Sequence, residues 1–66
     1  MDIQLNGTAH PLPVGTTLAE LLALSGLAER RVAVEINGEI VPRSQHAVRQ
    51  LQPGDRVEIV HALGGG

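Results

Sequence analysis

The chain has 66 residues, a formal net charge of −2, no cysteine and no Phe, Tyr or Trp. This length allows one domain near the lower limit for independent folding, and the lack of cysteine excludes disulfides, thiolate metal sites and a cysteine nucleophile. The composition offers neither a basic surface for a phosphate backbone nor aromatic rings for base stacking, which argues against nucleic-acid binding. Because no basic segment precedes an apolar run at the N-terminus, we expect a cytoplasmic protein without a signal peptide or transmembrane helix.

The N-terminal residues predict a β-hairpin. Apolar and polar side chains alternate over residues 1–5, which is typical of a half-buried strand. Asn6-Gly7 then predicts a tight turn, because both central residues of a type I′ turn have positive φ. Residues 8–12 form the expected returning strand. Pro11 has no amide hydrogen for the ladder, so we place this strand at a sheet edge.

A helix is expected after this hairpin. Thr17 and Glu20 have the spacing of a capping box, and Gly26 fits the residue that follows a helix C-terminus. One helical face carries Leu18, Leu21, Leu22 and Ser25. Such a short helix is marginal by itself, so we expect its leucines to pack against a sheet rather than bind a partner.

The next segment predicts a second hairpin. Residues 32–36 alternate between apolar and polar side chains, and Asn37-Gly38 repeats the turn signal. A short strand follows at residues 39–41, and Pro42 ends it. The second hairpin therefore has the same turn chemistry as the first.

The C-terminal third predicts a helical turn and one more strand. We expect Ser44 to cap a single turn in which Val48 and Leu51 point inward. Residues 52–55 form a Pro-Gly turn, and residues 56–60 form the last strand. The inward-facing residues of this strand are expected to be Val57 and Ile59.

Together, these elements predict an α+β fold of the β-grasp, or ubiquitin-like, type. One main helix covers one face of a mixed sheet. The first strand keeps a free edge after its hairpin, and the last strand can fill that edge in parallel. The last strand then lies in the centre, residues 1–66 form a single domain, and residues 62–66 extend from it as a flexible tail.

The tail Ala62-Leu63-Gly64-Gly65-Gly66 carries the most specific chemical signal. Glycines without Cβ atoms can enter a channel that is too narrow for other residues, and no side chain crowds the Gly66 carboxylate. This arrangement suits activation of the C-terminus as an acyl-adenylate, followed by attack of a sulfur nucleophile. A frayed terminus or a leftover linker is the alternative interpretation.

The other polar residues do not form a catalytic or metal-binding pattern. The three histidines, His10, His46 and His61, are scattered, and we interpret them as exposed or hydrogen-bonded structural residues. The carboxylates of the last strands suit a charged outer face. A partner-binding surface near the root of the tail is predicted at Ala33, Glu35, Glu58, Val60 and Leu63. A solvated outer face is the alternative for these residues.

The sequence resembles the ThiS family of sulfur carriers in thiamin biosynthesis. The resemblance is carried by residues 34–43 (VEINGEIVPR), residues 54–60 (GDRVEIV) and the terminal glycines. It covers essentially the whole chain. The sequence departs from the family pattern in two places: His46 stands where many such carriers have an aromatic residue, and the tail has three glycines where two would suffice.

The resemblance implies a carrier that is a substrate rather than an enzyme and binds no cofactor. An E1-like adenylyltransferase of the ThiF type would use ATP and magnesium to adenylate Gly66. A sulfur donor system with a cysteine desulfurase would then convert the carboxylate to a thiocarboxylate. A thiazole synthase of the ThiG type would receive the sulfur, and Gly64 and Gly65 would thread the tail into these partners.

Three other functions remain open on the residues alone. The chain could be the small-subunit carrier of molybdopterin synthase, a non-catalytic ubiquitin-like binding module, or a modifier joined to lysines of other proteins. Incubation with an E1-like adenylyltransferase and ATP separates a binding module from a carrier, because only a carrier forms an adenylate.

Overall fold

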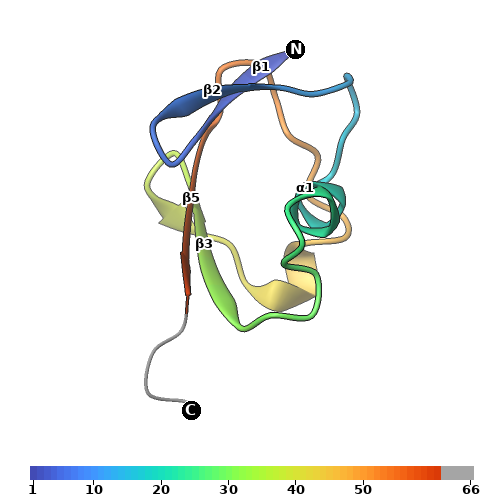
Figure 1. Cartoon of the computed structure of the whole chain (residues 1–66), viewed down its shortest axis with the longest axis vertical. Coiled ribbons are helices and arrows are strands. Elements are labelled where there is room, and N and C mark those ends of the chain that lie inside the picture. Colours follow the sequence, from blue (N-terminus) through green and yellow to red (C-terminus); the bar gives the residue numbers. More distant parts are fainter. Residues whose placement is uncertain (62–66) are drawn as a thin grey trace.

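Alternating apolar residues and two Asn-Gly turns produce a mixed five-stranded sheet in the computed structural model, which describes residues 1–61 (Figure 1). The elements are β1 (Asp2–Leu5), β2 (Thr8–Pro11), α1 (Leu18–Leu24), β3 (Val32–Ile36), β4 (Glu39–Ile40) and β5 (Arg56–His61). The strand order is β2-β1-β5-β3-β4; β1 and β5 are parallel, and all other neighbours are antiparallel. The predicted α+β β-grasp architecture is confirmed, including the central position of the last strand.

Both hairpin turns have the predicted conformation. Asn6 and Gly7 have φ values of 50° and 84°, and Asn37 and Gly38 have 54° and 86°. Asparagine tolerates this left-handed region better than other residues with a Cβ atom, and glycine enters it freely. The turns therefore fix the registers of β1 with β2 and of β3 with β4.

The helix begins and ends as its sequence predicts. The Thr17 hydroxyl accepts a hydrogen bond from the Glu20 amide (3.2 Å), and the Thr17 amide donates to Glu20 Oε1 (2.9 Å). At the other end, Gly26 has a φ of 74°, and the Leu27 amide donates to the Leu22 carbonyl (2.7 Å). A capping box and a Schellman motif thus satisfy backbone groups that a helix leaves unpaired.

Figure 1 shows α1 beside one face of the sheet, and the core fills the space between them. It consists of the aliphatic side chains of Ile3, Leu12, Leu18, Leu21, Leu22, Val34, Ile36, Val41, Leu51, Val57 and Ile59. Leu18 and Leu21 have no exposed surface, and each buried leucine contributes about 1.5–3 kcal/mol. The helix leucines are therefore core residues, as expected.

The segment after β4 differs from its prediction at Val48. Leu51 is buried, but Val48 is 70% exposed and does not point inward. The prediction assumed one helical turn across both residues. The chain instead forms turns there, and Gln50 then makes a β-bridge with Thr17, so the i, i+3 spacing does not place both side chains on one face.

Two serines also lie differently from their predicted positions. The helical turn is a 3₁₀-helix over Arg43–Gln45 with Pro42 as its N-cap residue, so Ser44 lies inside it and does not cap it. Ser25 is the exposed C-cap residue of α1 rather than a member of its packed face. The 3₁₀ turn begins earlier than the sequence suggested, whereas α1 ends where Gly26 predicts and its buried face stops at Leu22.

Candidate functional site

The sheet face turned away from α1 brings together four residues of the predicted binding surface. Val57 and Ile59 point into the core, so the intervening Glu58 and the following Val60 face outward. In the antiparallel register of β3 and β5, Ala33 lies opposite Val60, and Glu35 lies opposite Glu58. We call these four residues the outer patch.

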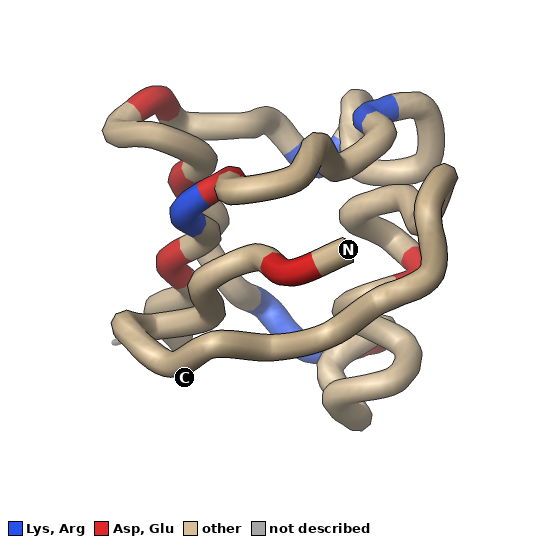
Figure 2. The backbone as a smooth tube through the Cα atoms, turned by 90° about the horizontal axis from the view of Figure 1, so that it is seen from above, with Lys and Arg blue, Asp and Glu red and all other residues tan. Residues whose placement is uncertain are grey.

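The outer patch combines apolar area with negative charge. Val60 is 58% exposed, and Ala33 beside it is also exposed. Glu35 is half-buried, and its partner across the strands carries the same charge. Like charges directly opposite each other on a sheet are destabilising, so folding alone does not favour this pair. Figure 2 shows acidic positions along the side of the molecule that carries the sheet.

A small hollow adjoins the outer patch. Its volume is about 140 Å³, and it is lined by Glu35, Gly38, Arg56 and Glu58. Pockets for drug-sized ligands have volumes of roughly 300–1,000 Å³. The hollow therefore suits one side chain of a protein partner better than a nucleotide.

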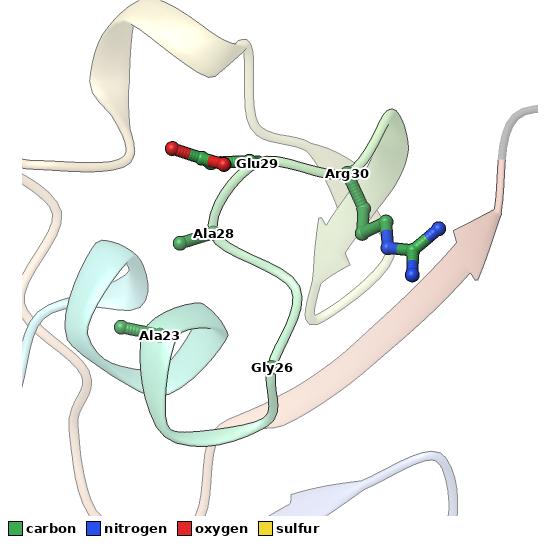
Figure 3. A pocket seen from close by; sticks show the side chains of 5 residues that line it. All are labelled: Ala23, Gly26, Ala28, Glu29 and Arg30. Atoms are coloured by element: carbon green, nitrogen blue, oxygen red, sulfur yellow. The ribbon is translucent and has the colours of Figure 1, made fainter.

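A second depression lies near the C-terminal end of α1 (Figure 3). Its lining includes Ala23, Gly26 and Ala28, together with Glu29 and Arg30. In Figure 3 the Glu29 and Arg30 side chains point in different directions. The two charged groups do not converge on one point, so this depression lacks the arrangement of an acid-base pair.

Two asparagine side chains anchor β5 to the turns on either side of it. Asn37 Oδ1 accepts a hydrogen bond from the Arg56 amide (3.0 Å), and Asn37 Nδ2 donates to Asp55 Oδ1 (3.0 Å). On the other side, Asn6 Oδ1 accepts a hydrogen bond from the Ile59 amide (2.8 Å). The strand that leads to the tail is therefore held by side chains as well as by its ladders.

Sequence reasoning assigned these asparagines to turns and missed their contacts with β5. It also placed Asp55 in a turn, although this carboxylate is buried and Oδ2 accepts a hydrogen bond from the Gln52 amide (2.8 Å). The available signal was the choice of asparagine over glycine at both first turn positions. Glycine satisfies the backbone there, so an amide side chain suggests an additional contact.

The histidines are separated, as predicted. His46 is buried, with Nε2 3.1 Å from the Val41 carbonyl oxygen, and its role as a hydrogen-bonded structural residue fits this contact. His10 lies on edge strand β2, and His61 ends β5. Within residues 1–61, no three His, Cys, Asp or Glu side chains gather closely enough to hold a metal ion. None of the helices in this range is long and apolar enough to cross a membrane.

The predicted tail residues Leu63, Gly64, Gly65 and Gly66 lie outside the described residues. The described part of the site is therefore the outer patch and the last residues of β5. The last described residue of β5 is His61, which pairs with Val32, the first residue of β3. The outer patch is thus adjacent to the point where residues 62–66 begin.

Comparisons with known proteins find relatives that match nearly the whole chain. The model of the ThiS family matches residues 3–66. The sulfur carrier protein ThiS of Escherichia coli is 35% identical over 66 residues, with all of both chains covered. The crystal structure of the thiamine biosynthesis protein ThiS from Geobacter metallireducens superposes with a TM-score of 0.86 at 30% identity, again with both chains fully covered.

A larger relative contains the same region as part of a longer chain. The thiazole synthase of Magnetococcus marinus is 46% identical over 66 residues, which is all of this chain but 20% of that protein. The chain therefore spans about a fifth of the length of this curated relative. The similarity concerns the small β-grasp region alone.

Proposed function

This chain belongs to the ThiS family of sulfur carriers in thiamin biosynthesis, and we propose that it carries sulfur as a thiocarboxylate on Gly66. The observation that carries the proposal is the end-to-end match with a protein named as a sulfur carrier. The family match extends to residue 66 and so includes the terminal glycines. The β-grasp body adds support, because its central strand β5 ends at His61, three residues before Gly64 in the sequence.

The chemistry explains why a carrier needs activation. A carboxylate is a poor electrophile, so an oxygen of the Gly66 carboxylate first attacks the α-phosphorus of ATP and pyrophosphate leaves. A sulfur nucleophile then attacks the carbonyl carbon of the acyl-adenylate, and AMP leaves with the bonding electron pair. When the nucleophile is a donor persulfide, the product is an acyl disulfide. A thiol then attacks the donor's sulfur atom in that S–S bond, forms a new disulfide with it and leaves the thiocarboxylate on Gly66. An E1-like adenylyltransferase with ATP and magnesium supplies this catalysis, and the carrier is its substrate.

The sulfur acceptor in this proposal is a thiazole synthase. Support comes from the relative of that name, in which a region like this chain is joined to a much longer protein. Joining two proteins in one chain raises their effective concentration, which benefits partners that must meet. The sulfur would come from a donor system with a cysteine desulfurase. The thiocarboxylate delivers it without release of free sulfide.

The outer patch is the proposed docking surface for the adenylyltransferase, together with Leu63. A partner that holds Gly66 in its active site must also contact the carrier body near the point where β5 ends. The patch offers an exposed valine beside charged residues, and interfaces often combine an apolar centre with a polar rim. The adjoining hollow would accept a side chain, and its two glutamates outnumber Arg56, so its net charge favours a cationic one.

The test uses the full chain with its cognate adenylyltransferase. ATP-pyrophosphate exchange should depend on the carrier, and intact mass after sulfur transfer should show one oxygen replaced by sulfur. A variant without Gly65 and Gly66 is the control and should support no exchange. No exchange with the full chain would indicate a binding module, whereas attachment to lysines of other proteins would indicate a modifier. Sulfur transfer to molybdopterin synthase instead of thiazole synthase would assign the other carrier pathway.

A further inference from the structure

The two edges of β5 are held very unequally. Toward β3, the register runs from Ile36 opposite Val57 to Val32 opposite His61. Toward β1, the paired positions end at Leu5 opposite Val57. The chain then turns away into β2, so within the described residues no strand lies beside residues 58–61 on that edge.

Asn6 continues the ladder where β1 ends. Its backbone amide donates to the Val57 carbonyl (2.9 Å), and its Oδ1 accepts a hydrogen bond from the Ile59 amide (2.8 Å). Alternate residues of a strand direct their backbone groups to the same edge, so Val57 and Ile59 are successive ladder positions toward β1. The asparagine side chain thus takes the place of the next strand residue. Its Nδ2 lies 3.5 Å from the Ile59 carbonyl, a longer and weaker contact.

We propose that Asn6 is a positioning residue for the docking end of β5. By fixing Ile59, it keeps the last described residues of β5 extended, which presents Glu58 and Val60 to the partner. The inference rests on the proposed carrier function. It adds a residue far away in sequence that acts through the backbone of β5 without touching the reacting atoms.

The expected consequence of losing this side chain is a lower fraction of docking-competent carrier. Without it, residues 58–61 are held by β3 alone, and strand ends with one neighbour open more readily. A partner that binds only the form in which residues 58–61 are paired as a strand then shows a higher apparent dissociation constant. This constant is inversely proportional to the fraction of carrier in that form. The value of kcat is unaffected, because every carrier molecule that is bound to the partner already has the end of β5 in its strand conformation. The effect should therefore appear in KM rather than in kcat.

The experiment compares Asn6→Gly with the matched control Asn37→Gly in full-length chains. Glycine accepts the positive φ at both turns, so the folded variants lose side-chain contacts without backbone strain, and the added entropy of the unfolded chain is the same for both. Asn37 anchors the start of β5 at Asp55 and Arg56, away from the outer patch residue Val60. A third variant, Asn6→Asp, keeps an oxygen acceptor for the Ile59 amide. The readouts are KM and kcat for the carrier in ATP-pyrophosphate exchange, hydrogen exchange of the Ile59 amide, and Tm.

We expect Asn6→Gly to raise KM with little change in kcat, by at most about fivefold, which is the change in the opening equilibrium that the loss of one hydrogen bond produces. The Ile59 amide should exchange faster, and Asn6→Asp should restore KM. Asn37→Gly should lower Tm and raise KM by clearly less than Asn6→Gly does, because its contacts lie at the start of β5. An unchanged KM in Asn6→Gly, or an equal rise in both glycine variants, would overturn the positioning role. If the wild-type chain supports no ATP-pyrophosphate exchange, the carrier function itself is wrong, and this inference fails with it.

Discussion

Replacing Val60 with aspartate should weaken adenylyltransferase binding while the carrier stays folded. Val60 lies opposite Ala33 on the sheet face away from α1, and 58% of its surface is exposed. Complete burial of a valine side chain contributes about 1.5–3 kcal/mol. If docking covers the exposed part, its contribution is about 1–2 kcal/mol, which corresponds to a roughly 5- to 30-fold change in Kd.

The aspartate adds an electrostatic cost to this loss of apolar area. It places a third carboxylate beside Glu35 and Glu58, and any apolar partner surface would have to desolvate it. The lower limit of the expected change is therefore the apolar contribution alone. The chain should stay folded because Val60 is not a core residue, although the added like charge should lower Tm slightly.

Val14→Asp is the matched control for this substitution. Val14 is 84% exposed, but it lies in the connection between β2 and α1, outside the outer patch. Calorimetric titration of each variant with the adenylyltransferase gives Kd, and thermal unfolding gives Tm. An unchanged Kd for a folded Val60→Asp chain, or an equal loss in both variants, would show that the outer patch is a solvated surface.

Other substitutions test the tail and the anchoring of β5. The rate of ATP-pyrophosphate exchange should fall most for Gly66→Val, less for Gly65→Ala and least for Gly64→Ala, because a side chain nearer the carboxylate obstructs its alignment with ATP; equal rates would argue against a narrow channel. Deletion of Gly65 and Gly66 should abolish exchange and leave Tm nearly unchanged, since the core residues lie between positions 3 and 59. Asp55→Ala should lower the free energy of unfolding by about 1–3 kcal/mol in urea titrations, because the side-chain amide of Asn37 and the backbone amide of Gln52 both lose their acceptor.

The fold was predictable because local signals agreed with the global arrangement. Asn-Gly at both hairpins set the turns, and the capping box of Thr17 set the start of α1. Pro11 placed β2 at an edge, which left only one neighbour available to β1 in addition to its hairpin partner. Each local preference narrowed the topology further, as expected for a sequence with little frustration.

The structure of the segment between β4 and β5 was harder to predict, because tertiary contacts override its weak helical periodicity. Val48 and Leu51 have helical spacing, but the Leu51 amide donates to the Thr16 carbonyl (2.9 Å) and draws the chain toward α1. Spacing alone contains no information about that contact. For the same reason the burial of Asp55 was not visible: a carboxylate in a Pro-Gly turn is ordinarily exposed, and its partner Asn37 is distant in sequence.

The outer patch was predictable in position, because period-two alternation determines which residues of β3 and β5 share a face. The hydrogen bond from Ile59 to Asn6 could not be predicted from the sequence. It forms because β1 ends at Leu5 whereas the neighbouring strand β5 continues to His61. That arrangement separates two requirements of a carrier. The core holds the side chains of Val57 and Ile59, whereas the Asn6 side chain holds the Ile59 backbone on the edge toward β1. A substitution at Asn6 can therefore change how the carrier docks by much more than it changes whether the carrier folds, and comparison of KM with Tm distinguishes the two effects.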